Sequence, residues 1–503
     1  MRSTPDQGVR RRIDNFTAPG RVRCRKPGQG SSPRWGEVGL VLRFRLTLRS
    51  VELPIKPILM FRWLVVVTAI QWIAGCAGGT RDAAAFDSSI RPTHEFPLHV
   101  SADGASLLSD AGSPFYIHGE AAWSLIVQTT IDDAQVYLAD RQRRGINTIL
   151  VNLIEHKFSD QPPANVAGDA PFTTAGDLST PNEAYFAHAD RVIDLAAAHG
   201  IAVMLFPSYL GVAGGDEGWF SIMSRTTPAK CRSYGDYVGK RYAPRNNIIW
   251  IWGGDFTPPA GSAGERCMKA IADGIRTAAP QALASAHWNV ETTSRDEPTF
   301  AGMLDLVGVY SYVNGLAFCQ AARTLSPKRP TFLIETTYEN ERGVDVPEIR
   351  AQQWRGAIGC GAGEISGNNP IWRFGSGWQA QLNSPLSAAQ ARLRAITTAL
   401  RVADLGPDET FVTTGRGTGS SEIAVARTAD GAQAIAYFPP NAAPAISIDL
   451  SPMAAPVTAT WHDPTANAKS PAGSGLAGRQ WFSPPGANAS GSRDWVLVLR
   501  AGG

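Results

Sequence analysis

The sequence lacks the short motifs that mark several large functional classes. No GxGxxG pattern, and no GxxxxGK followed by Ser or Thr, comes after a strand-like segment, which argues against a nucleotide-binding protein. None of the six cysteines stands in a CxxC pair, so a zinc cluster held by thiolates is not expected. No period recurs along the chain, which argues against a repeat array.

Residues 60–503 also lack an excess of positive charge. Residues 1–59 contain 13 Lys and Arg against 4 Asp and Glu, a balance of +9, whereas the whole chain carries only +3. Residues 60–503 therefore carry −6. Because nucleic-acid binding depends on clustered positive charge, this acidic body does not favour a nucleic-acid partner.

Residues 60–76 have the layout of a lipoprotein signal peptide. Arg62 gives a positive start, residues 64–70 form an apolar run, and residues 73–76 (IAGC) resemble a lipobox. In a lipobox the cysteine, here Cys76, becomes the lipid-modified N-terminus after cleavage. The apolar run is too short to span a bilayer, so it is read as a signal and not as a membrane helix.

This layout also predicts where the mature protein begins. A signal peptide should open a chain, so we expect Met60 to be the true start and residues 1–59 to be a mis-called upstream segment. Residues 77–91 are rich in small side chains and predict a tether. The sequence thus predicts an exported protein that is lipid-anchored to the bacterial cell envelope, in the outer membrane or facing the periplasm.

Strand-like and helix-like segments alternate over residues 92–406, which favours a parallel α/β architecture. Thr130 and Asn182 each stand where a helix is expected to begin, and residues 387–402 form an amphipathic closing helix. Eight units over roughly 290 residues match a (β/α)8 TIM barrel better than an open doubly wound sheet. The predicted strands are residues 115–118, 146–154, 201–206, 247–252, 282–287, 305–310, 331–334 and 363–366.

Residues 407–503 follow a different pattern. Short alternating runs, punctuated by Gly, Pro and Asn, replace the helix periodicity. This pattern predicts a small antiparallel β-sandwich domain. The runs are residues 422–427, 434–438, 446–450, 457–461 and 495–499.

Four cysteines remain once Cys76 and one cysteine upstream of it are set aside, and four cysteines allow three pairings. In an oxidising compartment they can form disulfides. On the barrel layout Cys231 and Cys267 fall on consecutive outer helices, and Cys319 and Cys360 fall on consecutive connections. The layout therefore predicts one disulfide within each of these two pairs.

Two carboxylates stand directly after opposed strands of the predicted barrel. The fourth strand runs into Gly253, Gly254 and Asp255, and the seventh runs into Glu335. Catalytic groups of such barrels lie at the carboxyl ends of the strands. A helix cap for one acid and an arginine partner for the other are the structural alternatives, but the matched positions favour catalysis. Two carboxylates so placed can flank one glycosidic bond, as its hydrolysis requires.

Aromatic, amide and histidine side chains are expected around the same mouth. Aromatic rings and amides suit sugars, which offer apolar faces and hydrogen-bonding edges. The histidines come from separate strands without the spacing of a metal motif, so neither a metal ion nor a cofactor is expected. The candidate substrate-binding residues are His118, Glu120, Trp123, Asn152, His156, His287, Trp288, Tyr310, Tyr338, Glu339 and Trp372.

The barrel segments resemble the apiosidase-like proteins, which comprise glycoside hydrolase family 140 and its relatives. The resemblance rests on residues 115–123 (FYIHGEAAW), residues 249–255 (IWIWGGD) and Glu335 with Tyr338 and Glu339. The tail resembles a small β domain that often follows them and carries a "collagen-binding" label, through its WHDP, FSPP and DWVL segments.

The resemblance implies a (β/α)8 hydrolase that removes terminal apiose from plant pectic side chains. It also implies that Asp255 acts as the acid/base and Glu335 as the nucleophile. The first strand reads HGEAAW where the family has Gly-Asp-Thr-Ala-Trp, and the eighth reads GEISGNNPIW where a Tyr-Gly pair is usual. These departures lie at the mouth and leave the sugar open.

The sequence therefore predicts a glycosidase that cleaves a terminal sugar from a plant or bacterial polysaccharide by a retaining route. Its expected partners are an oligo- or polysaccharide substrate and a membrane, reached through the lipid anchor, and we expect a monomer. One alternative is a non-catalytic glycan-binding surface lipoprotein with a decayed barrel. Another is an adhesin that acts through residues 408–503.

Overall fold

The computed structural model describes residues 95–313, 315–400, 404–454 and 456–502. The predictions made for residues 1–91, Cys76 among them, lie outside these ranges. None of the helices in the described ranges is long and apolar enough to cross a membrane.

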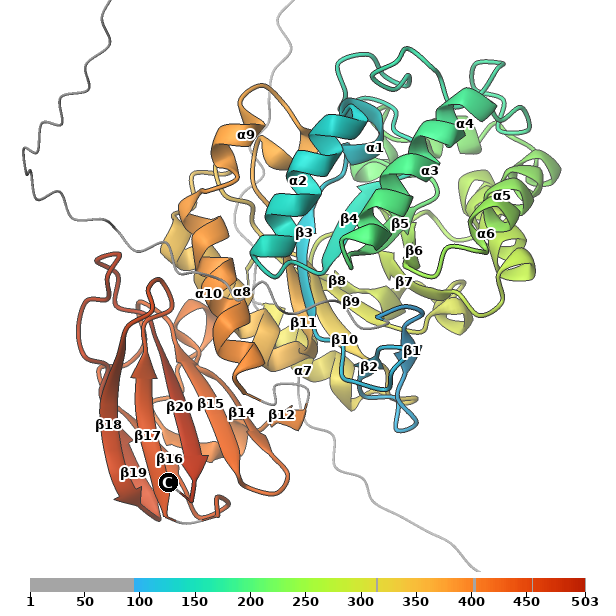
Figure 1. Ribbon diagram of the computed structural model, residues 1–503. Helices are drawn as coiled ribbons and strands as arrows, with labels where there is room; N and C mark the ends of the chain where they lie inside the picture. The colour runs from blue at the N-terminus through green and yellow to red at the C-terminus, as the bar shows by residue number, and fades with distance from the viewer. Residues whose placement is uncertain (1–94, 314, 401–403, 455, 503) are drawn as a thin grey trace, which may run out of the picture. The chain divides into compact units, whose positions relative to one another are not determined.

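Eight parallel strands form the central sheet of the larger domain (Figure 1). They are β3 (Ile117–Ala121), β4 (Thr148–Asn152), β5 (Ala202–Phe206), β6 (Ile248–Gly253), β7 (Leu283–His287), β9 (Val307–Tyr310), β10 (Thr331–Glu335) and β11 (Gly361–Ser366). They pair in the order β7-β6-β5-β4-β3-β11-β10-β9, and the short β8 (Thr292–Thr293) adds antiparallel to β9. A small hairpin of β1 (His99–Val100) and β2 (Leu107–Leu108) precedes the sheet.

The barrel closes where β7 meets β9. The Leu306 N–H donates to the Ala284 carbonyl at 3.1 Å. Beside it the Ser294 hydroxyl accepts from the Gly308 N–H at 2.8 Å and contacts the Ser285 hydroxyl at 3.0 Å. These bonds satisfy backbone groups that would otherwise form an open sheet edge. The predicted (β/α)8 barrel is therefore confirmed.

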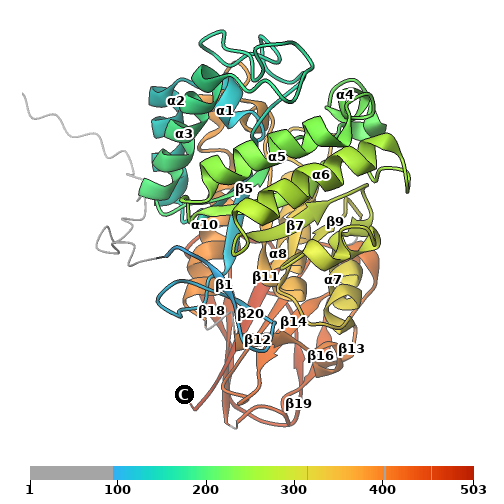
Figure 2. The same ribbon diagram turned by 90° about the vertical axis from the view of Figure 1, so that its right-hand side faces the viewer.

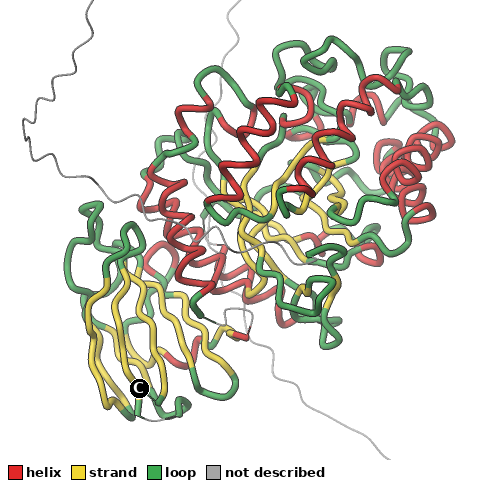
Figure 3. The backbone as a smooth tube through the Cα atoms, viewed as in Figure 1, coloured by secondary structure: helices red, strands yellow, loops and turns green. Residues whose placement is uncertain are grey.

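Helices surround this sheet, as the red segments of Figure 3 show. Thr130 and Asn182 begin α2 and α3, where their side chains accept the N–H groups of Asp133 and Ala184, so the predicted helix starts are confirmed. The helices are α1 (Leu125–Gln128), α2 (Ile131–Arg143), α3 (Glu183–Ala198), α4 (Phe220–Met223), α5 (Pro228–Tyr242), α6 (Ala263–Ala278), α7 (Gly315–Thr324), α8 (Val346–Cys360), α9 (Trp378–Gln381) and α10 (Pro385–Thr398).

The first barrel strand was predicted to begin and end too early. Residues 115–118 were expected to form it, but β3 begins at Ile117 and runs through Ala121. Ile117 and Ala121 face the barrel interior, in one cluster with Met204. Side chains alternate along a strand, so His118 and Glu120 point outward to the helices and not to the mouth.

The two predicted disulfides are present. Cys231 of α5 is bonded to Cys267 of α6, and Cys319 of α7 is bonded to Cys360 at the end of α8. Each bridge ties neighbouring outer helices together. Figure 2 shows α5 and α6 running side by side across the front of the barrel.

The C-terminal strands form two antiparallel sheets, so the predicted β-sandwich is confirmed. One sheet has the order β12-β14-β15-β20-β17-β18 and the other β13-β16-β19, with one apolar core cluster drawn from both. The strands are β12 (Leu405–Pro407), β13 (Val412–Thr414), β14 (Ala424–Thr428), β15 (Gln433–Phe438), β16 (Ile446–Asp449), β17 (Val457–His462), β18 (Lys469–Leu476), β19 (Arg479–Phe482) and β20 (Trp495–Ala501).

The sandwich and the barrel share a buried apolar cluster. Trp354 of α8 stacks on Tyr437 of β15, with ring centroids 5.6 Å apart and planes 7° from parallel. Leu393 of α10 belongs to the same cluster as Val496 and Val498 of β20. Burial of this kind of apolar area stabilises a contact by about 25 cal/mol for each Å² removed from water. The two domains are therefore packed together and not merely linked.

Candidate active site

Asp255 is placed by a tight turn directly after β6. Gly253 and Gly254 have φ values of 94° and 115°, which glycine adopts readily. A Cβ on Gly253 would lie 2.3 Å from the His287 carbonyl oxygen, and one on Gly254 would lie 2.4 Å from the Tyr209 ring. Asp255 itself has φ 55°, an uncommon backbone conformation that tends to cluster at functional sites.

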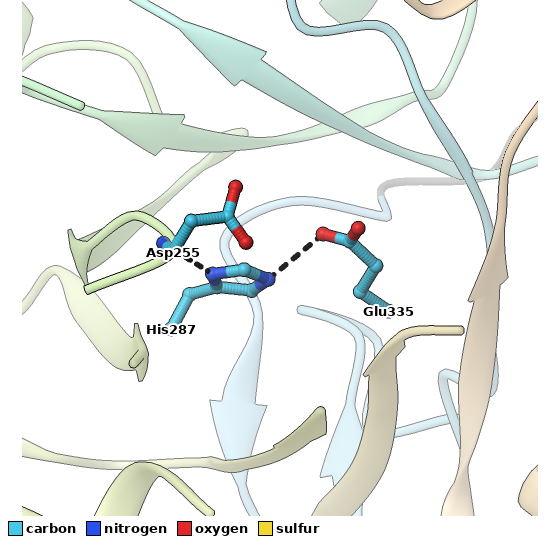
Figure 4. Close-up of side chains that lie close together, drawn as sticks. All are labelled: Asp255, His287 and Glu335. Atoms are coloured by element: carbon cyan, nitrogen blue, oxygen red, sulfur yellow. Dashed lines mark hydrogen bonds and ion pairs between the residues drawn. The ribbon is translucent and has the colours of Figure 1, made fainter. Parts of the chain in front are cut away.

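Glu335 is the last residue of β10 and is aimed by an irregularity in that strand. Opposite β9, Leu333 pairs with Val309 and Glu335 pairs with Tyr310, so Ile334 is an extra residue between them. Such a bulge re-aims the side chain that follows it, and bulges are common next to active sites. Glu335 is 4% exposed, and its carboxylate faces Asp255 (Figure 4).

His287, at the end of β7, lies between the two acids (Figure 4). Its Nδ1 accepts the backbone N–H of Asp255 at 3.1 Å, and its Nε2 lies 2.9 Å from Oε2 of Glu335. Since Nδ1 accepts, the imidazole proton sits on Nε2 and is donated to Glu335. One ligand atom from each of the three side chains lies within 4.8 Å of the other two.

The protonation of His287 is fixed by this geometry. Burial lowers the pKa of His287, but the Glu335 hydrogen bond and the charges of Asp255 and Glu335 more than offset that effect. A second proton, however, has no place except Nδ1, which already accepts the Asp255 amide. We therefore assign a neutral imidazole that holds both partners in place.

A tyrosine hydroxyl donates a hydrogen bond to each of the two acids. Tyr209 donates to Oδ2 of Asp255 at 2.7 Å, and Tyr312 donates to Oε1 of Glu335 at 3.0 Å. Tyr310 in turn lies 2.8 Å from the Tyr312 hydroxyl, to which it donates. Tyr209 was not among the predicted site residues, whereas Tyr312 was expected with Tyr310 among the aromatic residues at the mouth. Tyr209 follows β5 within three residues of its end, which is the signal that could have found it.

Burial and neighbouring groups shift the pKa of Glu335. Burial raises its pKa above the usual range, and the nearby negative charge of Asp255 raises it further. Hydrogen bonds from His287 and Tyr312 act in the opposite direction without cancelling the rise. The two donors thus favour the ionised carboxylate against the effect of burial, and a perturbed pKa is common for a group with a chemical task.

Several predicted residues do surround these acids. Trp123 donates its indole N–H to the Tyr338 hydroxyl at 2.9 Å, and its ring centroid lies 5.7 Å from that of His287. Tyr310 stacks on His287 with centroids 4.3 Å apart. Asn152 ends β4 beside Trp123, whose carbonyl accepts its backbone N–H. The Asn152 amide group has no hydrogen-bond partner within the described ranges and is fully buried.

His156 and Trp372 lie further from the acids. The His156 ring packs edge-on against Trp219, with centroids 5.0 Å apart. Trp372 packs edge-on against Phe158 and donates its indole N–H to Glu341 at 2.7 Å. Through Phe158, which also contacts Tyr209, the Trp372 side chain is connected to the rim of the site.

His118 and Glu120, predicted to bind substrate, do not line this site. His118 contacts Glu364 at 3.3 Å and Thr397 at 3.0 Å, between β3, β11 and α10. Glu120 accepts from Arg141 of α2 at 2.7 Å in a fully buried ion pair. Both side chains are used to dock helices on the outside of the sheet.

Trp288 and Glu339 were also predicted to bind substrate, but their side chains make other contacts. Trp288 is 1% exposed, packs in the outer core and donates its indole N–H to the Ser294 carbonyl. The Glu339 carboxylate accepts from Asn368, Ser384 and the Leu386 N–H, and so holds the start of α10. These hydrogen bonds give both side chains a structural role.

Asp255, His287 and Glu335 are also the group in the described ranges whose spacing could hold a metal ion. Both nitrogens of His287 are already used, however, one by the Asp255 amide and one by Glu335. A metal would have to displace one of these bonds. The donor set fits proton transfer better, and the absence of a metal or cofactor stays a prediction.

Two family models match the chain. Residues 101–403 match a family model described as "Apiosidase-like, catalytic domain", and residues 407–500 match one described as "Putative collagen-binding domain of a collagenase". No curated protein matches the chain.

Two solved structures show the same fold. A structure described as a glycoside hydrolase has a TM-score of 0.71 and 21% identity, covering 81% of this chain and 97% of its own. A glycoside hydrolase family 5 protein from Bacteroides vulgatus also has a TM-score of 0.71, with 20% identity, covering 80% of this chain and 93% of its own.

Proposed function

Because this chain belongs to the apiosidase-like family and is a glycosidase, we propose that it releases a terminal sugar from a plant or bacterial polysaccharide by a retaining reaction. The observation that carries the proposal is the pair of acids at the mouth. One oxygen of Asp255 and one of Glu335 lie within 4.8 Å of each other. Retaining enzymes hold their carboxyl groups about 5–5.5 Å apart, and inverting ones about 6.5–9.5 Å.

In the first step Asp255 donates a proton to the leaving glycosidic oxygen while Glu335 attacks the anomeric carbon. The bond between that carbon and the leaving oxygen breaks, and an ester to Glu335 forms. In the second step Asp255 takes a proton from water, the water oxygen attacks the same carbon, and Glu335 leaves. His287 positions Glu335 for attack and fixes the backbone of Asp255, so it is a positioning residue.

A screen of oligosaccharides with product chromatography tests this proposal, and apiose-bearing pectic oligosaccharides belong in it. On a substrate that is cleaved, proton NMR of the first turnovers should show a free sugar with the anomeric configuration of the substrate. An inverted first product would contradict the retaining step. Release of internal fragments would contradict the proposal that the enzyme removes a terminal sugar.

The dependence of kcat/KM on pH should report the ionisation of Glu335. Only ionised Glu335 can attack, and its pKa is raised, so kcat/KM should fall as pH drops through a value above the ordinary 4.5 of a glutamate. Tyr312→Phe removes a donor that lowers this pKa. Its acid limb should therefore move up by about one pH unit, since a hydrogen bond to a charged group contributes on the order of 1.5 kcal/mol.

Tyr338→Phe is the matched control for this profile. The Tyr338 hydroxyl accepts from Trp123 and makes no hydrogen bond to either acid among the described residues. Its acid limb should stay where the unmodified enzyme has it. An unmoved limb in Tyr312→Phe, or an equal shift in both variants, would show that Glu335 does not set the acid limb.

We further propose that the protein works at the cell envelope, held by a lipid on Cys76. The support for this is the signal-like layout of residues 60–76.

A further inference from the structure

A group of positive side chains gathers on the β-sandwich beside α10, away from the two acids. His462 ends β17 and pairs across the sheet with Lys469, the first residue of β18. Arg500 lies on β20, next to β17, and its guanidinium donates to the Ala399 carbonyl at the end of α10. Arg392 projects from α10 itself, which packs on this sheet (Figures 1 and 2). We call these four residues the His462 cluster.

The His462 cluster has no matching negative partner in the described ranges. None of its three cations takes part in an ion pair there, unlike Arg141 and Arg350, whose buried guanidinium groups meet carboxylates. Arg392 Nε and His462 Nδ1 are both shielded from solvent and lack a hydrogen-bond partner among the described residues. Buried polar atoms in proteins usually have a partner, which can be protein, water or an ion, so a bound acceptor would satisfy the Arg392 Nε–H.

Burial lowers the pKa of Arg392 and the charge of Asp463 acts in the opposite direction, but this carboxylate does not fill the role of a bonded partner. Its Oδ1 accepts the backbone N–H groups of Thr465 and Ala466 and the Thr465 hydroxyl. Its Oδ2 accepts the Ala489 N–H at 2.8 Å. The carboxylate is thus used to hold the loop after β17, and it makes no hydrogen bond to the cations of the His462 cluster among the described residues.

We propose that the His462 cluster is an oxyanion site, which binds a single carboxylate, sulfate or phosphate group through Arg392, Lys469 and His462. Guanidinium and ammonium groups are the usual partners of such anions, and an imidazole N–H adds a directed donor. Because the protein is a glycosidase, the acidic group of a sugar is the source to which the proposal commits. The site lies between the β-sandwich and α10, and it contains neither of the catalytic acids.

The imidazole of His462 reports on this site directly. Burial and the charges of Lys469, Arg392 and Arg500 lower its pKa to about 4. An anion bound beside it offsets those charges and raises the pKa. Proton NMR of the full protein in sodium sulfate, against sodium chloride at the same ionic strength, should show the His462 signal titrating at a higher pH. The signal is assigned by its loss in His462→Gln.

Arg392→Gln is the decisive variant. It should weaken sulfate binding by about tenfold or more, the loss expected for one charged hydrogen bond. In chloride its unfolding temperature should not fall, because the change relieves repulsion, but the rise that sulfate gives the unmodified protein should disappear. A purely structural Arg392 would lower the unfolding temperature equally in both salts. Lys240→Gln, an exposed change on α5, is the matched control and should keep the sulfate response.

Trigalacturonate and a neutral trisaccharide of the same length then identify the source of the anion. A shift of the His462 pKa with trigalacturonate alone supports an acidic sugar. A shift with sulfate but with neither sugar overturns the sugar assignment and leaves a site for free oxyanions. No shift with sulfate over chloride overturns the site itself. Turnover should be unchanged in Arg392→Gln, so these results are separable from failure of the proposed glycosidase mechanism.

Discussion

Glu335→Gln should abolish turnover while leaving the protein folded. Glutamine keeps the shape of the side chain and can still accept from His287 Nε2 or the Tyr312 hydroxyl. It cannot form the ester to the sugar, so the covalent route is lost. Asp255→Asn should lower kcat by about 10²- to 10⁴-fold, the usual contribution of a positioned acid or base. For Glu335→Gln we expect a loss at least as large. Steady-state rates on a cleaved substrate measure both.

Azide distinguishes the two roles. In Glu335→Ala the vacated space lets azide attack the anomeric carbon while Asp255 protonates the leaving oxygen, so a glycosyl azide of inverted configuration should form. In Asp255→Ala, with an activated leaving group, azide should instead attack the sugar ester on Glu335, and the glycosyl azide should keep the configuration of the substrate. The opposite pattern would exchange the two assignments. Full activity in either variant would remove that residue from the mechanism.

The positions of the two acids could be read from the sequence because they depend on local features. A buried apolar strand that runs into two glycines and an aspartate predicts a tight turn at the strand end, and Gly253, Gly254 and Asp255 form that turn. Glu335 likewise directly follows a predicted strand, residues 331–334, and is the last residue of β10. Strands four and seven of a barrel lie opposite one another, so the fold class alone brings the two acids to one mouth.

The errors arose where a strand was predicted to end too early. His118 was expected at the end of the first strand and Glu120 beyond it, but β3 runs from Ile117 to Ala121 and includes both inside the strand. The local sequence pattern does not show that Glu364 contacts His118 and Arg141 pairs with Glu120 on the outer side of the sheet.

The links among the site residues could not be predicted either. His287 was expected at the mouth, but its bridge from the Asp255 amide to Glu335 depends on the exact approach of β6 to β7. Tyr209 depends in the same way on how the loop after β5 folds back over Gly254. Contacts of this kind are set by tertiary packing, which the period of a single strand does not report.

Arg350→Met should destabilise the whole protein by about 3–5 kcal/mol, although Arg350 is remote from the acids. Arg350 of α8 is 2% exposed and makes a bidentate pair with Asp494, both N–O distances being 2.7 Å. Tyr437 and Asn488 also donate to this carboxylate. Removing the guanidinium leaves a fully buried negative charge without its ionic partner. Urea denaturation followed by circular dichroism measures the loss.

The double variant Arg350→Met with Asp494→Leu tests whether the lost stability reflects the stranded charge. A buried ion pair replaced by apolar groups of similar size is often close to neutral, so the double variant should recover much of the loss. Arg232→Gln breaks an exposed pair with Asp236 and, as the matched control, should cost no more than about 1 kcal/mol. If Arg350→Met unfolds the sandwich alone and leaves the barrel transition in place, the two domains are independent. A single shifted transition shows instead that the C-terminal domain supports the barrel, as their shared core requires.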